Sequence, residues 1–283
     1  MKGFTPSPFL WLTACVVLFT DARRIIPSSL EQRQQHDVVG RGNRHLDQGN
    51  HTARLVQVDV DIPSSPDGHI VKDLPLLAEG ELNVRHWAGH LPASSQRDKY
   101  FFYWLFAPDG DFDPETVPLI IWLNGGPGCS SMDGLFLENG PFRLVKDASG
   151  GFSLKAEPNS WHKAPAYTLY IDQPVGTGLS FTTSKKYPGN DEEVNIDFYY
   201  FLQSFYKLHG DKFVRDGVAR TPLYFSGESH AGHFIPHMMN YILKRNDDLK
   251  SGNVRVNLAG AAIGNGWTGK FALNGSAALD AYS

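Results

Sequence analysis

The stretch Leu223-Tyr224-Phe225-Ser226-Gly227-Glu228-Ser229-His230-Ala231-Gly232 decides the fold of this protein. Its first three residues form a short apolar strand candidate, and a helix is expected from Ala231. Small residues at Gly227 and Ala231 permit a sharp turn between the strand and the helix. Such a nucleophile elbow places Ser229 at a helix N-terminus, where backbone N–H groups and the helix dipole favour a developing anion.

A second glycine-rich segment, Asn124-Gly125-Gly126-Pro127-Gly128-Cys129-Ser130-Ser131, directly follows the apolar run Leu119–Leu123. Glycines leave backbone N–H groups unshielded, so these groups can donate hydrogen bonds to an oxyanion. On its own the segment also fits an ordinary glycine turn.

Short apolar runs alternate with helical patterns along the rest of the chain. This alternation predicts the α/β class, with a mostly parallel sheet whose chemistry gathers at the carboxyl ends of the strands. Helices are expected over Phe198–Leu208 and Ala231–Leu243, the latter with Lys244 and Arg245 in its last turn. Strands are expected at Tyr100–Phe106, Leu119–Leu123, Tyr167–Ile171, Leu223–Phe225 and Leu258–Ile263.

Four sequence blocks occur in order along the chain. They are Trp122–Ser131 followed by Glu138-Asn139-Gly140-Pro141-Phe142, Ile171–Gly178, Gly227-Glu228-Ser229, and Ile263-Gly264-Asn265-Gly266-Trp267. Over roughly Leu74 to Trp267, these blocks resemble the serine carboxypeptidase family. The resemblance implies the α/β-hydrolase fold and the removal of single residues from peptide C-termini, with peptide or protein C-termini as partners and no cofactor.

The resemblance also implies roles for individual residues. Ser229 is the expected nucleophile, and the backbone N–H groups of Gly126 and His230 are the expected oxyanion hole. The residues expected to bind the terminal carboxylate of the substrate are Asn124, Glu138 and Glu228. Two neighbouring carboxyl groups resist double ionisation, so one should retain a proton and donate a hydrogen bond to a substrate carboxylate. This reasoning predicts faster peptidase action in acid than at neutral pH.

Histidines near the elbow depart from the family pattern, which has a Tyr at position 230. A role for His230 as the base for Ser229 is disfavoured, because adjacent residues on such a turn point in different directions. His233 and His237 could share a helix face, but no H-E-x-x-H pattern or further ligand is visible, so they are expected to be packing or surface histidines and no metal site is expected.

The order of the catalytic triad in α/β-hydrolases is Ser, then Asp, then His along the chain. No histidine follows His237. We therefore expect a hydrolase domain truncated at its C-terminal side, without the orienting Asp and the base. By resemblance, Cys129 is expected to pair with a downstream cysteine. A sheet that lacks its later strands would expose a hydrophobic edge.

The N-terminal part is expected to be a processed region. Phe9 to Phe19 is an apolar run too short to span a bilayer comfortably, and it predicts a signal peptide at residues 1–22. Residues 23–74 are predicted to be a polar arm or propeptide, partly disordered, and residues 75–283 the incomplete hydrolase domain. Sequons at Asn50 and Asn274 are possible N-glycan sites. These features favour the secretory pathway: extracellular, vacuolar or lysosomal, or late Golgi.

Composition removes several classes of function. The net charge of −4 argues against a nucleic-acid binder, and two cysteines in 283 residues argue against a disulfide-dense scaffold. No second apolar run is long enough for a transmembrane helix.

Three functional hypotheses stay open from sequence alone. The leading one is a serine carboxypeptidase acting through an acyl-enzyme on Ser229. Trp87–Leu91 and Ser131–Gly134 resemble the branch that trims C-terminal Lys and Arg in prohormone processing. The alternatives are an acyltransferase of the same fold and a catalytically inactive relative that binds or protects a partner.

Overall fold

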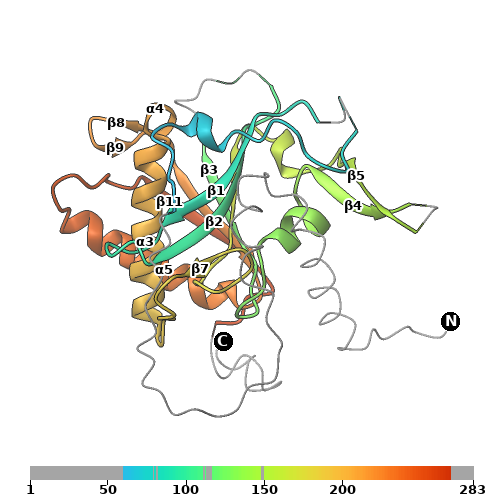
Figure 1. Ribbon diagram of the computed structural model, residues 1–283. Coiled ribbons are helices and arrows are strands. Elements are labelled where there is room, and N and C mark those ends of the chain that lie inside the picture. Colours follow the sequence, from blue (N-terminus) through green and yellow to red (C-terminus); the bar gives the residue numbers. More distant parts are fainter. Residues whose placement is uncertain are drawn as a thin grey trace, which may run out of the picture. The chain divides into compact units, whose positions relative to one another are not determined.

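A seven-stranded sheet forms the centre of the computed structural model, which describes residues 60–268 except 79, 81, 111, 113–116 and 148–149. The order across the sheet is β1-β2-β6-β3-β10-β11, with the short β7 paired to β2 (Figure 1). The expected signal peptide and both sequons lie outside the described residues. The strands are β1 (His86–Pro92), β2 (Lys99–Phe106), β3 (Leu119–Leu123), β6 (Tyr167–Ile171), β7 (Phe181–Thr182), β10 (Leu223–Glu228) and β11 (Leu258–Gly264).

The five strands expected from the sequence are all present, and four of them run parallel. β6, β3, β10 and β11 pair in parallel, whereas β1 and β2 join the sheet antiparallel. Only a short connection separates β1 from β2, which suits a hairpin and is too short for the crossover that parallel strands need. The sheet is therefore mixed but mostly parallel on the side that carries Ser229.

Two long helices, α3 (Asp191–Leu208) and α5 (Ala231–Asp247), cover one face of the sheet and pack against each other (Figure 1). Both confirm the helices expected from the sequence. The first begins earlier than its apolar spacing indicates, because the Asn190 side chain accepts a hydrogen bond from the Glu193 N–H at 3.0 Å and so caps the N-terminus. Asp191 thereby lies in the first turn of α3.

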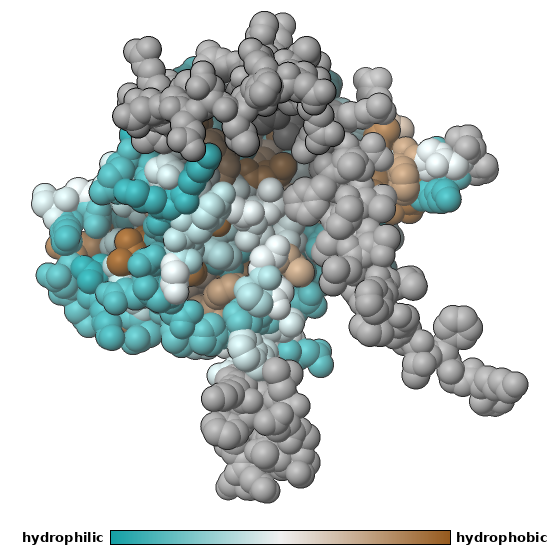
Figure 2. Space-filling view, turned by 60° about the horizontal axis from the view of Figure 1, so that its bottom comes forward, coloured by the Kyte–Doolittle hydropathy of each residue, from teal (hydrophilic) through white to brown (hydrophobic). Residues whose placement is uncertain are grey.

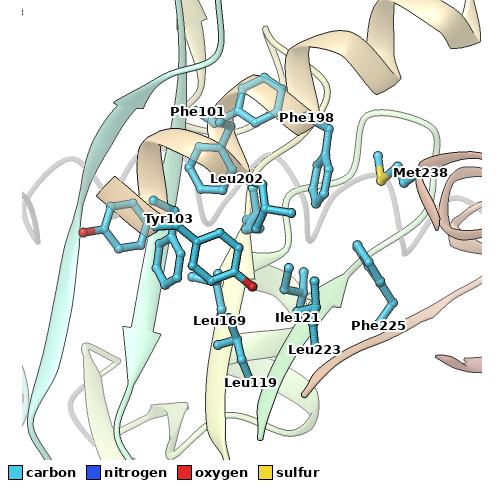
Figure 3. Close-up of a cluster of buried hydrophobic side chains, with 14 of the residues drawn as sticks. Phe101, Tyr103, Leu119, Ile121, Leu169, Phe198, Leu202, Leu223, Phe225 and Met238 are labelled. Atoms are coloured by element: carbon cyan, nitrogen blue, oxygen red, sulfur yellow. The ribbon is translucent and has the colours of Figure 1, made fainter. Parts of the chain in front are cut away.

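The core lies between these helices and the sheet (Figure 3). Strand side chains such as Phe101, Ile121 and Phe225 meet Phe198 and Met238 from the helices, and all five are at most 1% exposed. This packing explains why the parallel strands read as continuous apolar runs.

The aromatic strand β2 is buried on both faces. Phe101 and Tyr103 pack toward α3, where both contact Phe201. Trp104 and Phe106, on the opposite face, pack against Phe142. Alternation along the strand therefore sends every second side chain to a different apolar layer.

Smaller elements surround the sheet. A hairpin of β4 and β5 projects away from it, at the right of Figure 1. A π turn, η2, precedes this hairpin and carries Glu138 at its end. The remaining elements are η1 (Pro66–His69), η2 (Gly134–Glu138), β4 (Phe142–Lys146), β5 (Phe152–Ala156), η3 (Trp161–Lys163), α4 (Gly210–Phe213), β8 (Val214–Arg215) and β9 (Val218–Ala219).

Residues 60–74, which the sequence predicts to be the end of a polar arm, contact the sheet. Ile70 forms a bridge to Trp87 of β1, and His69 Nδ1 lies 2.7 Å from the hydroxyl oxygen of the buried Tyr103. These residues thus contact the sheet, Ile70 through its backbone and His69 through its side chain.

Exposure differs sharply between the two strands at the Ser229 side of the sheet. β10 is mostly buried, whereas every residue of β11 is partly or fully exposed. Elsewhere, the described surface in Figure 2 is mainly hydrophilic, with separate apolar patches. Within the described ranges, no helix has the length and apolarity needed to cross a bilayer.

Candidate active site

Ser229 occupies the turn between β10 and α5. Its φ is +54°, a conformation that strains any residue with a Cβ and is the mark of a nucleophile elbow. The turn is held on both sides, because the Ser229 N–H donates to the Gly264 carbonyl at 3.0 Å and the Ser229 carbonyl accepts from the Trp267 N–H at 2.7 Å. Ser229 is exposed, so its hydroxyl is accessible from outside the sheet.

The small residues around the elbow are required by close packing. A Cβ added at Gly227 would lie 2.3 Å from the Leu123 carbonyl oxygen and 2.8 Å from the Ala231 Cβ. Real Cβ atoms do not approach backbone this closely, so only glycine fits between β3 and α5. The expectation that Gly227 and Ala231 permit the turn is confirmed.

The glycine-rich loop after β3 lies directly against the elbow. A Cβ at Gly125 would be 2.5 Å from the His230 backbone nitrogen and 2.9 Å from the Ser229 Cβ. Gly126 adopts φ +111°, which glycine tolerates. Neither the Gly126 N–H nor the His230 N–H donates to a partner within the described residues. Two strand ends that are far apart in sequence thus bring the two expected oxyanion donors to one place.

A buried carboxyl group holds the glycine-rich loop through hydrogen bonds to Ser130 and Ser131. Asp172, at the end of β6, accepts hydrogen bonds from the Ser130 hydroxyl at 2.6 Å, the Ser131 N–H at 2.9 Å and the Leu179 N–H at 2.8 Å. Burial raises the pKa of Asp172 to about 6, against the lowering effect of these three donors. Asp172 lies within the Ile171–Gly178 block of the sequence, but the sequence alone did not predict a role for it. Its position at the end of a buried strand was the available signal.

A cluster of one amide and two carboxyl groups lies beside the elbow. The Asn124 Nδ2 donates to Glu138 Oε1 and to Glu228 Oε1, both at 3.1 Å. The Asn124 Oδ1 in turn accepts from the Trp122 indole N–H at 2.7 Å and from the Gly134 N–H at 3.0 Å. These two donors fix the orientation of the amide, so its nitrogen must point to the carboxyl groups. The structure therefore brings together the three residues expected to form one site, from β3, η2 and β10.

The carboxyl groups in this cluster influence each other. Burial raises the pKa of Glu138, and the neighbouring Glu228 and Asp133 carboxylates raise it further, against the hydrogen bond from Asn124 and the charge of Arg143. Glu138 thus holds a proton to a higher pH than a free glutamate does.

The His230 side chain packs against neighbouring aromatic rings. Its ring stacks on Trp267, with centroids 4.5 Å apart, and contacts Phe234 at 4.7 Å. Burial lowers the pKa of His230, and the neighbouring His233 lowers it further, against the influence of Asp191. No hydrogen bond joins the Ser229 hydroxyl to any histidine in the part of the chain that the structure describes.

A sequence model of the serine carboxypeptidase family matches residues 75–282. The chain belongs to the serine carboxypeptidase family. The crystal structure of Kex1(delta)p, a prohormone-processing carboxypeptidase from Saccharomyces cerevisiae, superposes with a TM-score of 0.61 at 32% identity, covering 73% of this chain and 44% of that one. Together with the mixed sheet, this match establishes the α/β-hydrolase fold expected from the sequence.

Curated relatives extend the comparison. A serine carboxypeptidase family member from Dictyostelium discoideum is 42% identical over 209 residues, covering 73% of this chain and 36% of the relative. A pheromone-processing carboxypeptidase KEX1 from Phytophthora infestans is also 42% identical, over 202 residues, covering 70% of this chain and 32% of the relative. This chain spans about a third of the length of these relatives.

The two short motifs that resemble the Lys- and Arg-trimming branch lie in different places. Trp87–Leu91 belongs to β1, which is separated from β10 by β2, β6 and β3. Strands lie about 4.8 Å apart, so the motif is roughly 19 Å from β10 across the sheet. Trp87 and Leu91 are buried in the core, and the three residues between them are partly exposed. Ser131–Gly134, in contrast, leads directly into η2 and Glu138. The second motif therefore lies beside the Asn124–Glu138–Glu228 cluster, whereas the first lies at the other side of the sheet.

Proposed function

We propose that this chain supplies the nucleophile, the oxyanion hole and the carboxylate-binding site of a serine carboxypeptidase. The observation that carries the proposal is the strained, exposed Ser229 beside the Gly126 and His230 N–H groups, which have no hydrogen-bond acceptor among the described residues. An accessible hydroxyl beside two convergent backbone donors suits the attack on a carbonyl group and the stabilisation of the oxyanion that results.

In this mechanism, the Ser229 oxygen attacks the carbonyl carbon of the last peptide bond of the substrate. The carbonyl oxygen becomes an oxyanion and accepts hydrogen bonds from the Gly126 and His230 N–H groups. The bond to the C-terminal amino acid then breaks as its nitrogen takes up the proton that the Ser229 hydroxyl gave to a general base, and the free amino acid leaves. Water hydrolyses the acyl-enzyme that remains on Ser229. A general base must accept the Ser229 proton. In α/β-hydrolases this base is a histidine that follows the nucleophile and the acid in the chain.

The Asn124–Glu138–Glu228 cluster is proposed to recognise the terminal carboxylate of the substrate. Two ionised glutamates would repel that carboxylate, whereas a protonated Glu138 can donate a hydrogen bond to it. The raised pKa of Glu138 supports this role. It also explains why an exopeptidase built on this cluster should work best in acid.

A preference for basic C-terminal residues is proposed as the finer specificity. Several relatives bear the name pheromone-processing carboxypeptidase KEX1. The Asp133 carboxylate lies close enough to Glu138 to raise its pKa, which adds negative charge near the substrate site. A C-terminal Lys or Arg would be attracted by this charge. The same relationship, together with the apolar run at residues 9–19, supports a location in the secretory pathway.

Labelling with a fluorophosphonate probe tests the nucleophile. The 283-residue chain should be labelled, and Ser229→Ala should not be. Ser226→Ala is the matched control, because Ser226 lies three residues earlier on β10 with its hydroxyl donating to the Ala262 carbonyl. Equal labelling of wild type and Ser229→Ala would refute the proposal.

Release of single residues from peptides that differ only in a C-terminal Lys or Phe tests the reaction and its specificity. Faster release of Lys supports the basic preference, and faster release of Phe contradicts it. Acyl transfer to an added alcohol in place of peptide hydrolysis would favour the acyltransferase alternative.

A further inference from the structure

Two histidines on α5 face a carboxylate on α3. His233 and His237 lie one turn apart, and their ring centroids are 4.6 Å from each other. The His233 Nε2 lies 3.0 Å from Asp191 Oδ2, and the His237 Nδ1 lies 3.9 Å from the same oxygen. One ligand atom from each of the three residues lies within 4.8 Å of the others.

The sequence reveals two members of this cluster but hides the third. His233 and His237 are spaced as i and i+4, which predicts a shared helix face. Asp191 is far from them in the sequence and joins them only because the N-terminus of α3 packs beside the first turns of α5. The expectation of no metal site rested on the lack of a further ligand, and the fold supplies one.

We propose that Asp191, His233 and His237 form a binding site for Zn²⁺. Two imidazoles and one carboxylate are a donor set that zinc takes in proteins, with water in the fourth position. Bonds of about 2.0–2.1 Å in a tetrahedron place ligand atoms roughly 3.3 Å apart. The two nitrogen–oxygen separations from Asp191 Oδ2, 3.0 and 3.9 Å, lie on either side of this value. Small side-chain rotations would therefore bring the three ligand atoms to the distances that an ion needs.

The three side chains are accessible to solvent and are held by their neighbours, and both properties suit a metal ion that exchanges with solvent. The Asp191, His233 and His237 side chains are 48%, 25% and 48% exposed, which gives an ion and its water ligand access from solvent. The His233 ring is flanked by the rings of His230 at 5.2 Å and Trp267 at 5.8 Å, which restrict its rotation. All three backbone positions are helical, so the ligands start from a rigid frame.

An ion bound here would join the N-terminus of α3 to the first two turns of α5. The second of these helices begins two residues after Ser229. The site lies next to the elbow without including Ser229, Gly126 or the carboxyl cluster. Zn²⁺ would therefore act as a clip that stabilises the packing of α3 against α5.

An alternative explanation of the same contacts is an ion pair between Asp191 and His233. The two hypotheses predict different results, because an ion pair does not bind zinc and does not need His237. A titration with Zn²⁺ therefore separates them.

The experiment uses the full chain without a histidine tag. Zn²⁺ binding is measured by competition with a chromophoric chelator, and Co²⁺ is added separately to detect the absorption bands of a tetrahedral site. One Zn²⁺ should bind per chain and raise the melting temperature. Asp191→Asn and His237→Gln should each weaken binding about tenfold or more, whereas Asp191→His should retain it by replacing one ligand with another.

Asp248→Asn is the matched control, because Asp248 follows the far end of α5 and its side chain is 84% exposed. Circular dichroism of each variant shows that the helices persist. Absence of Zn²⁺ binding by the wild type would overturn the proposal. Binding that Asp191→Asn or His237→Gln leaves unchanged would overturn it equally, because the site needs all three ligands.

Discussion

Replacing Gly125 by alanine should disable the elbow although Ser229 itself is not substituted. The added Cβ would lie 2.5 Å from the His230 nitrogen and 2.9 Å from both the Glu228 carbonyl oxygen and the Ser229 Cβ. Non-bonded heavy atoms settle at roughly 3.5 Å, so the loop and the elbow must separate by about 1 Å. Backbone surrounds the new methyl group, so no flexible side chain can absorb the shift. Overpacking of this kind costs about 1–3 kcal/mol of stability.

The functional effect should exceed the effect on stability. A separation of 1 Å moves the Gly126 N–H away from the oxyanion position, and loss of one such donor lowers the rate by about 10²–10³. The rate of fluorophosphonate labelling should therefore fall about 100-fold, with the melting curve lowered but still cooperative. Gly189→Ala is the control, because a Cβ there meets nothing within 4 Å. If Gly125→Ala is labelled at the wild-type rate, the loop does not supply an oxyanion donor in the way we infer.

Three further predictions concern charged groups. Burial raises the pKa of Asp172 from 3.8 to about 6, so its ionised form is disfavoured in the folded state. Between pH 4 and pH 6, urea titrations should show the wild type losing about 2 kcal/mol of stability relative to Asp172→Asn, and a constant difference would refute this. Glu138 loses its proton as the pH rises through its raised pKa, so kcat/KM for peptides should fall toward neutral pH, and Glu138→Gln should flatten that fall; an equally steep profile in the variant would count against a protonated Glu138. Lys99 and Asp197 form an ion pair 2.7 Å apart, with side chains that are 14% and 5% exposed. Lys99→Met should lower the free energy of unfolding by about 3–5 kcal/mol in denaturant titrations, because it leaves the buried Asp197 carboxylate unpaired, while removing both charges should cost less.

Local patterns were enough to predict the elements that carry the chemistry. The apolar runs at Leu119–Leu123 and Tyr167–Ile171 became strands with those bounds, because strands buried on both faces leave little choice of residue. Helix ends were less accurate: α3 starts at Asp191, where a polar cap and acidic first turn replace the apolar spacing. The mostly parallel sheet agrees with the expectation, but which strands run antiparallel was not predicted. β1 and β2 pair antiparallel because the connection between them is short.

The nucleophile elbow and the glycine loop could be predicted from local sequence alone, because each is a turn whose backbone requires small residues at fixed positions. Only the tertiary structure decided which side chains meet. Asn124, Glu138 and Glu228 converge because three elements end at the same edge of the sheet. Asp172 reaches behind the loop, and Asp191 reaches His233 and His237, through the packing of strands and helices far apart in the chain. Such contacts depend on strand order and helix packing, which no local spacing encodes.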